Sequence, residues 1–226
     1  MTDAADPNPT DDEIALRRRR AAVAGHRGDA TTARDLFGDD DETVRATALG
    51  ALARCGALTA DELGAALGDP ASTVRIRALE HAAEIGGRDI ASGLALLPLL
   101  DDSDPAVVEV AAWALGERDP AEPGSVAALA RLATDADDAL IRESAVAALG
   151  SIGDPAGLAA ILTATQDKAT VRRRAVIALA PFEGTEVDSA LHRALQDRDW
   201  QVRQAAEDLL ADPLDIYLDE GSDPDD

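Results

Sequence analysis

Residues 137–150 read Asp-Asp-Ala-Leu-Ile-Arg-Glu-Ser-Ala-Val-Ala-Ala-Leu-Gly, and the same pattern occurs six times along the chain. With Ile141 as position zero, most copies share a basic residue at +1, Ala at +4 and Leu at +8. Position zero is occupied by Val44, Val74, Val107, Ile141, Val171 and Val202, which are 30, 33, 34, 30 and 31 residues apart. Repetition at a period of 20–50 residues is typical of solenoids, propellers or arrays. The pattern therefore predicts one elongated repeat array.

The composition favours helices. Ala and Leu dominate, aromatic residues are only 2% of the chain, and Gly and Pro fall between the repeated segments. At 100° per residue, positions 0, +4, +7, +8 and +11 form one apolar arc, which predicts a helix buried on two sides. A shorter helix is expected before each such helix, and we predict an all-α solenoid of helical hairpins. The expected first helices span 31–37, 59–67, 90–100, 124–134, 156–164 and 186–195.

The last copy contains the most specific motif. The segment 197–206 reads Asp-Arg-Asp-Trp-Gln-Val-Arg-Gln-Ala-Ala. It resembles the HEAT-like repeat named after phycobilisome lyase subunits, a branch of the HEAT and armadillo α-solenoids, and the resemblance covers about residues 31–211. It implies a right-handed superhelix of about six hairpins, with the second helix of each hairpin on the concave surface. On this resemblance Trp200 belongs to the signature turn and has a structural role.

The array is expected to have flanking segments at both ends. Residues 1–12, with Pro7 and Pro9, are predicted to be a disordered acidic tail, and residues 13–28 an N-terminal capping helix. The repeats then occupy 29–211, and 212–226 form an acidic C-terminal tail. Within this tail, 214–218 are apolar enough to dock on the last repeat or on a partner.

Charge is the second large feature. The chain has 44 acidic and 21 basic residues, and its formal net charge is −23. Repulsion between so many negative charges destabilises a compact protein in dilute buffer. At 1 M salt the Debye length is about 3 Å, so this repulsion is largely screened. Abundant Asp with almost no Lys looks like a protein from a salt-accumulating halophile, such as a halophilic archaeon. The alternative is an acidic surface that mimics nucleic acid or binds a basic protein.

The expected compartment is the cytoplasm. The sequence has no apolar run of about 18 residues and no basic-then-apolar start typical of a secretory signal. Its single cysteine, Cys55, cannot form an intrachain disulfide and is predicted to be a buried apolar filler.

The arginines at +1 are expected to form a structural ladder between repeats. Each planar guanidinium suits bidentate binding of an Asp in a neighbouring turn. The predicted ladder residues are Arg45, Arg75, Arg142, Arg172 and Arg203; the third copy has Val108 instead. The alternative is a row of cations along a phosphate backbone. A nucleic-acid binder would use this row or the clusters Arg17–Arg20 and Arg172–Arg174, which the net charge opposes. The preferred interpretation of Arg17–Arg20 is that some of these arginines pair with the acidic first repeat.

No catalytic, cofactor-binding or metal-ligating residue is predicted. The three histidines are His26, His81 and His192, and none belongs to a ligand pair. Deoxyhypusine hydroxylase, a relative built from such repeats, holds iron with repeated His-Glu pairs, whereas this chain has one reversed Glu80-His81. An enzyme or enzyme accessory subunit, of bilin lyase or hydroxylase type, is therefore an alternative inferred only from relatives.

Candidate binding residues are those expected on the concave surface, at +2, +3 and +6 of the second helices. Aromatic and Arg side chains are enriched in binding hot spots. The candidates are Trp113, Val110, Arg173, Arg174, Ile177 and Arg77, whereas Glu109 and Glu143 are interpreted as solvated. We predict a non-catalytic scaffold or adaptor that binds an unknown protein partner through this face. No membrane or nucleic-acid partner is expected, and the chain is expected to be a monomer or weakly associating.

Overall fold

The protein is described by a computed structural model that covers residues 10–85 and 93–211. In this part of the chain there are twelve α-helices, two short 3₁₀ helices and no strand. In chain order the elements are α1 (Asp11–Arg27), α2 (Ala30–Phe37), α3 (Glu42–Arg54), α4 (Ala60–Leu67), α5 (Ser72–Ile85), η1 (Leu97–Asp101), α6 (Pro105–Gly116), α7 (Ser125–Asp135), α8 (Ala139–Ile152), η2 (Pro155–Gly157), α9 (Leu158–Ala164), α10 (Ala169–Ala178), α11 (Thr185–Ala194) and α12 (Trp200–Leu210).

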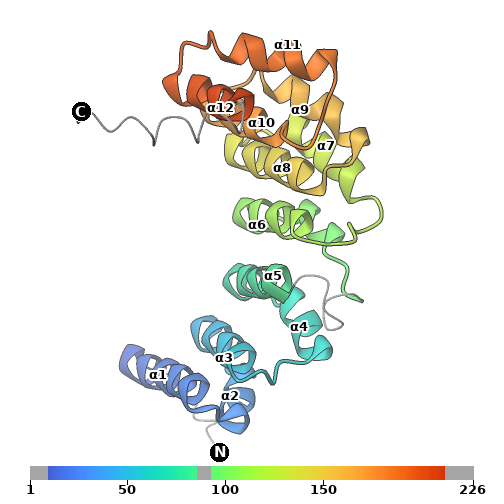
Figure 1. Cartoon of the computed structure of the whole chain (residues 1–226). Coiled ribbons are helices and arrows are strands. Elements are labelled where there is room, and N and C mark those ends of the chain that lie inside the picture. Colours follow the sequence, from blue (N-terminus) through green and yellow to red (C-terminus); the bar gives the residue numbers. More distant parts are fainter. Residues whose placement is uncertain (1–9, 86–92, 212–226) are drawn as a thin grey trace, which may run out of the picture.

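The helices form two layers that stack along one curved axis. Helices α1, α3, α5, α6, α8, α10 and α12 form the inner, concave row, and the other helices lie on its outer side (Figure 1). The position-zero residues and the +4 alanines are buried in all six copies. The predicted all-α solenoid is therefore confirmed, and the repeated apolar arc is what buries each inner helix.

Close backbone contacts join three pairs of consecutive inner helices. A Cβ added at Gly116 of α6 would lie 2.7 Å from Ala148 Cα of α8, and one at Gly150 of α8 would lie 2.6 Å from Ala178 Cβ of α10. At the start of the array, a Cβ on Gly25 would lie 2.9 Å from Ala51 Cα. Side chains would keep these backbones apart, so glycine facing alanine determines the tight stacking.

The first helix begins earlier than the sequence predicted. Thr10 is its N-cap: Thr10 Oγ1 accepts from Glu13 N–H, and the Glu13 carboxylate accepts from Thr10 N–H at 2.8 Å. This capping box satisfies N–H groups at the helix start. Residues 10–12 therefore belong to α1 and its cap, not to a disordered tail. The remainder of that predicted tail, 1–9, and the predicted tail 212–226 lie outside the described residues.

The predicted first helix at 90–100 is wrong in its described part. Residues 94–96 are not helical, and only the short 3₁₀ helix η1 follows. Glu122 accepts hydrogen bonds from the N–H groups of Leu96 and Leu97 at 2.9 and 3.1 Å, and it pairs with Arg118. A carboxylate from the next connection thus replaces the helical bonding of this segment.

Gly56, Gly86 and Gly153 stand at +12 of their copies, where the sequence predicts that the second helix ends on a left-handed residue. Gly56 at φ 64° and Gly153 at φ 67° have this left-handed backbone. The third, Gly86, lies outside the described residues. Cys55, predicted to be buried, is only partly buried because it caps the end of α3, with its Sγ 3.9 Å from the carbonyl oxygens of Ala24 and Gly25.

Candidate partner-binding groove

A ladder of arginines runs between the turns that precede the inner helices. Arg142 shows the geometry: its Nε and Nη2 donate to the two carboxylate oxygens of Asp167 at 2.6 and 2.9 Å. Its Nη1 donates to the carbonyls of Ala136 and Asp137 at 2.7 and 3.0 Å. One guanidinium therefore ties its own turn to the next one, as bidentate geometry favours. The same two-oxygen pairing joins Arg45 to Asp69, Arg75 to Asp102 and Arg172 to Asp197.

The ladder has two ends. At the start, Arg17 pairs with Asp39 at 2.9 Å, although Arg17 lies outside the repeat pattern. At the other end, Arg203 Nη1 donates to the carbonyls of Asp197 and Arg198 at 2.8 and 3.3 Å. The sequence predicted that some of Arg17–Arg20 pair with the acidic first repeat, and Arg17 does so through Asp39.

One rung of the ladder is apolar on both sides. Val108 stands where the other copies have Arg, and it is buried. In the following turn, Ala136 offers its carbonyl to Arg142 just as Asp39 offers its own to Arg45 at 2.9 Å. Ala136 thus occupies the place of the rung Asp. Both charged partners are absent together, so this junction leaves no rung charge without its counterpart.

Two of the rung carboxylates have lowered pKa values. Hydrogen bonds from Arg142 lower the pKa of Asp167, and those from Arg172 lower the pKa of Asp197; burial partly opposes both shifts. In return, the bonds to Asp167 raise the pKa of Arg142. These groups therefore stay ionised at neutral pH, as a structural ladder requires.

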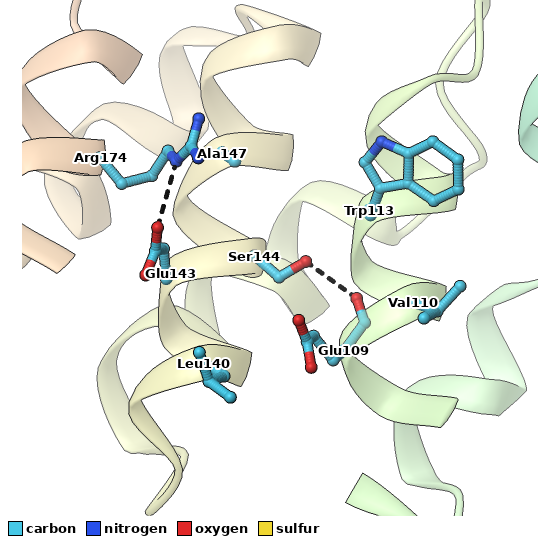
Figure 2. Close-up of a pocket in the computed structure, with 8 residues that line it drawn as sticks. All are labelled: Glu109, Val110, Trp113, Leu140, Glu143, Ser144, Ala147 and Arg174. Carbon is cyan, nitrogen blue, oxygen red and sulfur yellow. Dashed lines mark hydrogen bonds and ion pairs between the residues drawn. The ribbon is translucent and has the colours of Figure 1, made fainter. Parts of the chain in front are cut away.

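The junction without the charged rung carries an open groove on the concave side. It has a volume of about 490 Å³ and is lined by Glu109, Val110 and Trp113 of α6, by Leu140, Glu143, Ser144 and Ala147 of α8, and by Arg174 of α10. Trp113 is 40% exposed and Leu140 56% exposed. Figure 2 shows Trp113 toward one end of α6 and Glu109 toward the other, with small Ala147 on the facing helix.

Two polar contacts join the three helices that line this groove. Ser144 Oγ donates to the Glu109 carbonyl at 2.8 Å, so it bridges α8 and α6 (Figure 2). Across α8, Arg174 Nε lies 3.6 Å from a Glu143 oxygen, which is an ion pair longer than a hydrogen bond. The predicted candidates Trp113, Val110 and Arg174 thus line one groove, together with Glu109, Glu143 and Leu140, whose role the sequence did not indicate.

The other candidates lie elsewhere on the concave side. Arg173 and Ile177 of α10 line a second groove of about 320 Å³ with Trp200 and Leu209 of α12. Trp200 is 64% exposed, so the structural role predicted for this indole is not supported by burial. The sequence analysis did not include Trp200 among the concave candidates, because the resemblance assigned this residue to a signature turn.

Arg77 is separate from both grooves and pairs with Glu80 of its own helix at 2.7 Å. His81 Nδ1 lies 3.1 Å from Glu84 Oε2. The reversed Glu80-His81 pair is thus engaged in two local contacts. Across residues 10–85 and 93–211, no group of three or more His, Cys, Asp or Glu side chains is placed to hold a metal ion.

The fold places the arginines of each cluster, Arg17–Arg20 and Arg172–Arg174, in different environments. Arg17 and Arg172 pair with Asp39 and Asp197, while Arg18, Arg19 and Arg20 are exposed on α1. Arg172 is 7% exposed, so only Arg173 and Arg174 of its cluster reach the concave side. A continuous cationic track along the ladder is not formed. No helix in the described part of the chain is long and apolar enough to cross a bilayer.

The repeats match a known family. HEAT repeats match residues 60–150 and 93–180, which together cover more than half of the chain. The chain belongs to the HEAT-repeat family. The PBS lyase HEAT-like repeat also matches, over residues 171–197, which confirms the resemblance to this type of repeat in the fifth copy; the match ends where the 197–206 segment begins. No curated protein sequence matches the chain.

Solved structures share the fold at low sequence identity. An engineered protein matches with a TM-score of 0.61 and 23% identity, over 80% of this HEAT-repeat chain and 95% of its own. The YibA protein of Escherichia coli matches with a TM-score of 0.61 and 19% identity, over 91% and 77%. A designed armadillo repeat protein in complex with the peptide (KR)4 matches with a TM-score of 0.56 and 20% identity, over 88% and 98%. These likenesses show the solenoid fold.

Proposed function

We propose that this HEAT-repeat protein is a non-catalytic scaffold or adaptor that binds a protein partner through its concave face. We place it in the cytoplasm, as a monomer or a weakly associating chain. The observation that carries the proposal is Trp113, an indole 40% exposed in the groove between α6 and α8. Most large apolar side chains of the repeats are buried between helices, and the other exposed ones on the concave side are Leu140 in the same groove and Ile177 and Trp200 in the second groove. An exposed aromatic in a concave site is the residue type that dominates binding energy in interfaces.

The fold supports the same proposal. A row of inner helices presents one extended surface, and solenoids use such surfaces for binding. The designed armadillo protein of similar fold was solved with a peptide bound, which is consistent with a peptide segment as ligand. A nucleic-acid ligand is disfavoured by the net charge of −23 and by the ion pairs that engage Arg17 and Arg172.

The test is affinity capture from a lysate of the source organism in potassium chloride of about 1 M, where surface charges are largely screened. The purified baits are the wild-type chain, Trp113→Ala and Arg173→Glu. Leu16→Ala on α1 is the matched control, since Leu16 is 68% exposed and lies away from the groove. We expect one partner to be lost with Trp113→Ala and kept with Leu16→Ala.

Equal recovery of every bound protein by all four baits would contradict the proposal. Stoichiometric iron in the purified chain would contradict its non-catalytic part and favour the hydroxylase-like alternative. Circular dichroism of each variant in the capture buffer verifies that loss of binding does not come from unfolding.

A further inference from the structure

Glu109, on the concave side, differs from the partly buried carboxylates of the ladder. It is half-buried in the groove, and its carboxylate makes no hydrogen bond or ion pair with any residue of 10–85 or 93–211. The rung Asp residues, by contrast, each have an Arg partner. A partly desolvated charge without a counterion is costly, and a cation from outside would offset that cost.

Glu143 adds a second carboxylate to the same groove. Its contact with Arg174 is 3.6 Å, so no short hydrogen bond holds it. Figure 2 shows Arg174 on the side of Glu143 away from Trp113. Among the lining residues, two carboxylates therefore face one cation, and the groove favours a positively charged ligand.

Trp113 is a third residue of the groove, after Glu109 and Glu143, that can attract a cation. The face of an indole attracts an ammonium or guanidinium ion. Val110 and the exposed Leu140 provide apolar walls beside the carboxylates, against which the alkyl stems of Lys or Arg can pack. Ala147 opposite Trp113 leaves the space for such a side chain.

The spacing along α6 fixes how the ligand must be arranged. Glu109 and Trp113 are one helical turn apart, which is a rise of about 6 Å. Alternate residues of an extended chain point to the same side and are about 6.6 Å apart. A segment that runs along the groove between α6 and α8 can therefore place two side chains, from residues n and n+2, on these two positions.

We infer that this groove binds an extended segment of the partner with basic residues at n and n+2. One Lys or Arg lies against Trp113, and the other pairs with Glu109 and Glu143. This inference rests on the proposed function and names the chemistry of the partner at the same site.

The test uses two labelled peptides of identical composition and charge. One is Ser-Ser-Arg-Ser-Arg-Ser-Ser, with alternating arginines, and the other is Ser-Ser-Arg-Arg-Ser-Ser-Ser, with adjacent ones. Their binding to the full chain is measured by fluorescence anisotropy, in buffer in which circular dichroism shows a folded protein. We expect the alternating peptide to bind about fivefold more tightly, since adjacent residues of an extended chain point to opposite sides.

Three variants separate this site from general attraction to an acidic protein. Trp113→Leu leaves the net charge unchanged, and we expect it to weaken the alternating peptide about fivefold. Glu109→Gln is expected to weaken it to a similar extent. Glu207→Gln is the matched control, because it changes the net charge equally at an exposed position of α12 outside both grooves. It should change binding by less than about twofold.

Equal weakening by Glu109→Gln and Glu207→Gln, with no effect of Trp113→Leu, would overturn the inference in favour of diffuse attraction. Equal affinity for the two peptides would overturn the n and n+2 arrangement. If Trp113→Ala loses the captured partner while Trp113→Leu binds the basic peptides normally, the proposed function stands and the cationic chemistry is wrong.

Discussion

Two neighbouring junctions of the concave row share a close backbone contact but differ in the rung beside it. The α8/α10 junction and the α6/α8 junction both rest on a glycine that faces an alanine, Gly150 with Ala178 and Gly116 with Ala148. Only the first has a charged rung, Arg142 with Asp167; the second has Val108 and Ala136. The close contact is therefore common to both junctions, and the rung is replaceable when both partners change.

The groove with Trp113 lies at the junction without the charged rung. The rung is on the turn side of the helices and the groove on their concave side, so the two features occupy different faces. The copy that departs from the repeat in its packing is also the copy that departs from it on the surface. Divergence between copies thus coincides with the groove that we propose as the binding site.

The largest expected effect is on the contact that both junctions share. Gly150→Val places a side chain where a Cβ already lies 2.6 Å from Ala178 Cβ. Overpacking of this kind should lower the free energy of unfolding by about 3 kcal/mol, measured by denaturant unfolding. Gly38→Ala is the control, because nothing lies within 4 Å of a Cβ at Gly38. Equal stability of the two variants would show that the close contact is not needed.

The next effect concerns one partner of a charged rung. Arg142→Met keeps the apolar stem but leaves the Asp167 carboxylate and two turn carbonyls without their donor. We expect a loss of about 2 kcal/mol in the free energy of unfolding. Arg131→Met should have no measurable effect, since Arg131 and Asp101 are 60% and 81% exposed and 3.8 Å apart. A neutral Arg142→Met would mean that the rungs do not stabilise the stack.

A transplanted rung sharpens the comparison directly. Val108→Arg alone places a charge at a buried position, and Ala136→Asp alone adds a carboxylate without its rung partner. Together they recreate the Arg and Asp of the other junctions. A double-mutant cycle should give a favourable coupling of about 1 kcal/mol between the two positions. Zero coupling would show that the two positions are not equivalent to a rung.

The smallest effect is the dependence of a rung on pH. Because bonds from Arg142 lower the pKa of Asp167 in the folded state, its contribution is full above the unfolded pKa of about 3.9 and is lost as pH falls through the folded value. The stability difference between the wild type and Asp167→Asn, about 1 kcal/mol at pH 7, should therefore shrink below about pH 4. Unfolding curves from pH 7 to pH 3 test this, and a constant difference would contradict it.

The sequence by itself determined the fold of this protein, because the apolar arc, the +4 alanines and the +1 arginines are local patterns repeated at a fixed period. It also identified Trp113 as the exceptional residue of the third copy. What it could not determine depends on contacts between distant segments. Glu122 replaces the expected helix at 94–96 from 25 residues or more away. The sequence predicted that some of Arg17–Arg20 pair with the first repeat, but the packing of α1 decides that Arg17 contacts Asp39.

The groove itself was decided only by the tertiary structure. Glu109, Glu143 and Leu140 have no distinctive spacing within their own helices, so periodicity places them among ordinary solvent-facing positions. They line one groove because the Gly116 contact brings α6 against α8 and sets Trp113 opposite Ala147. A repeat pattern specifies which side of each helix is buried, whereas the shape and charge between two helices depend on the pair of side chains that packing brings together.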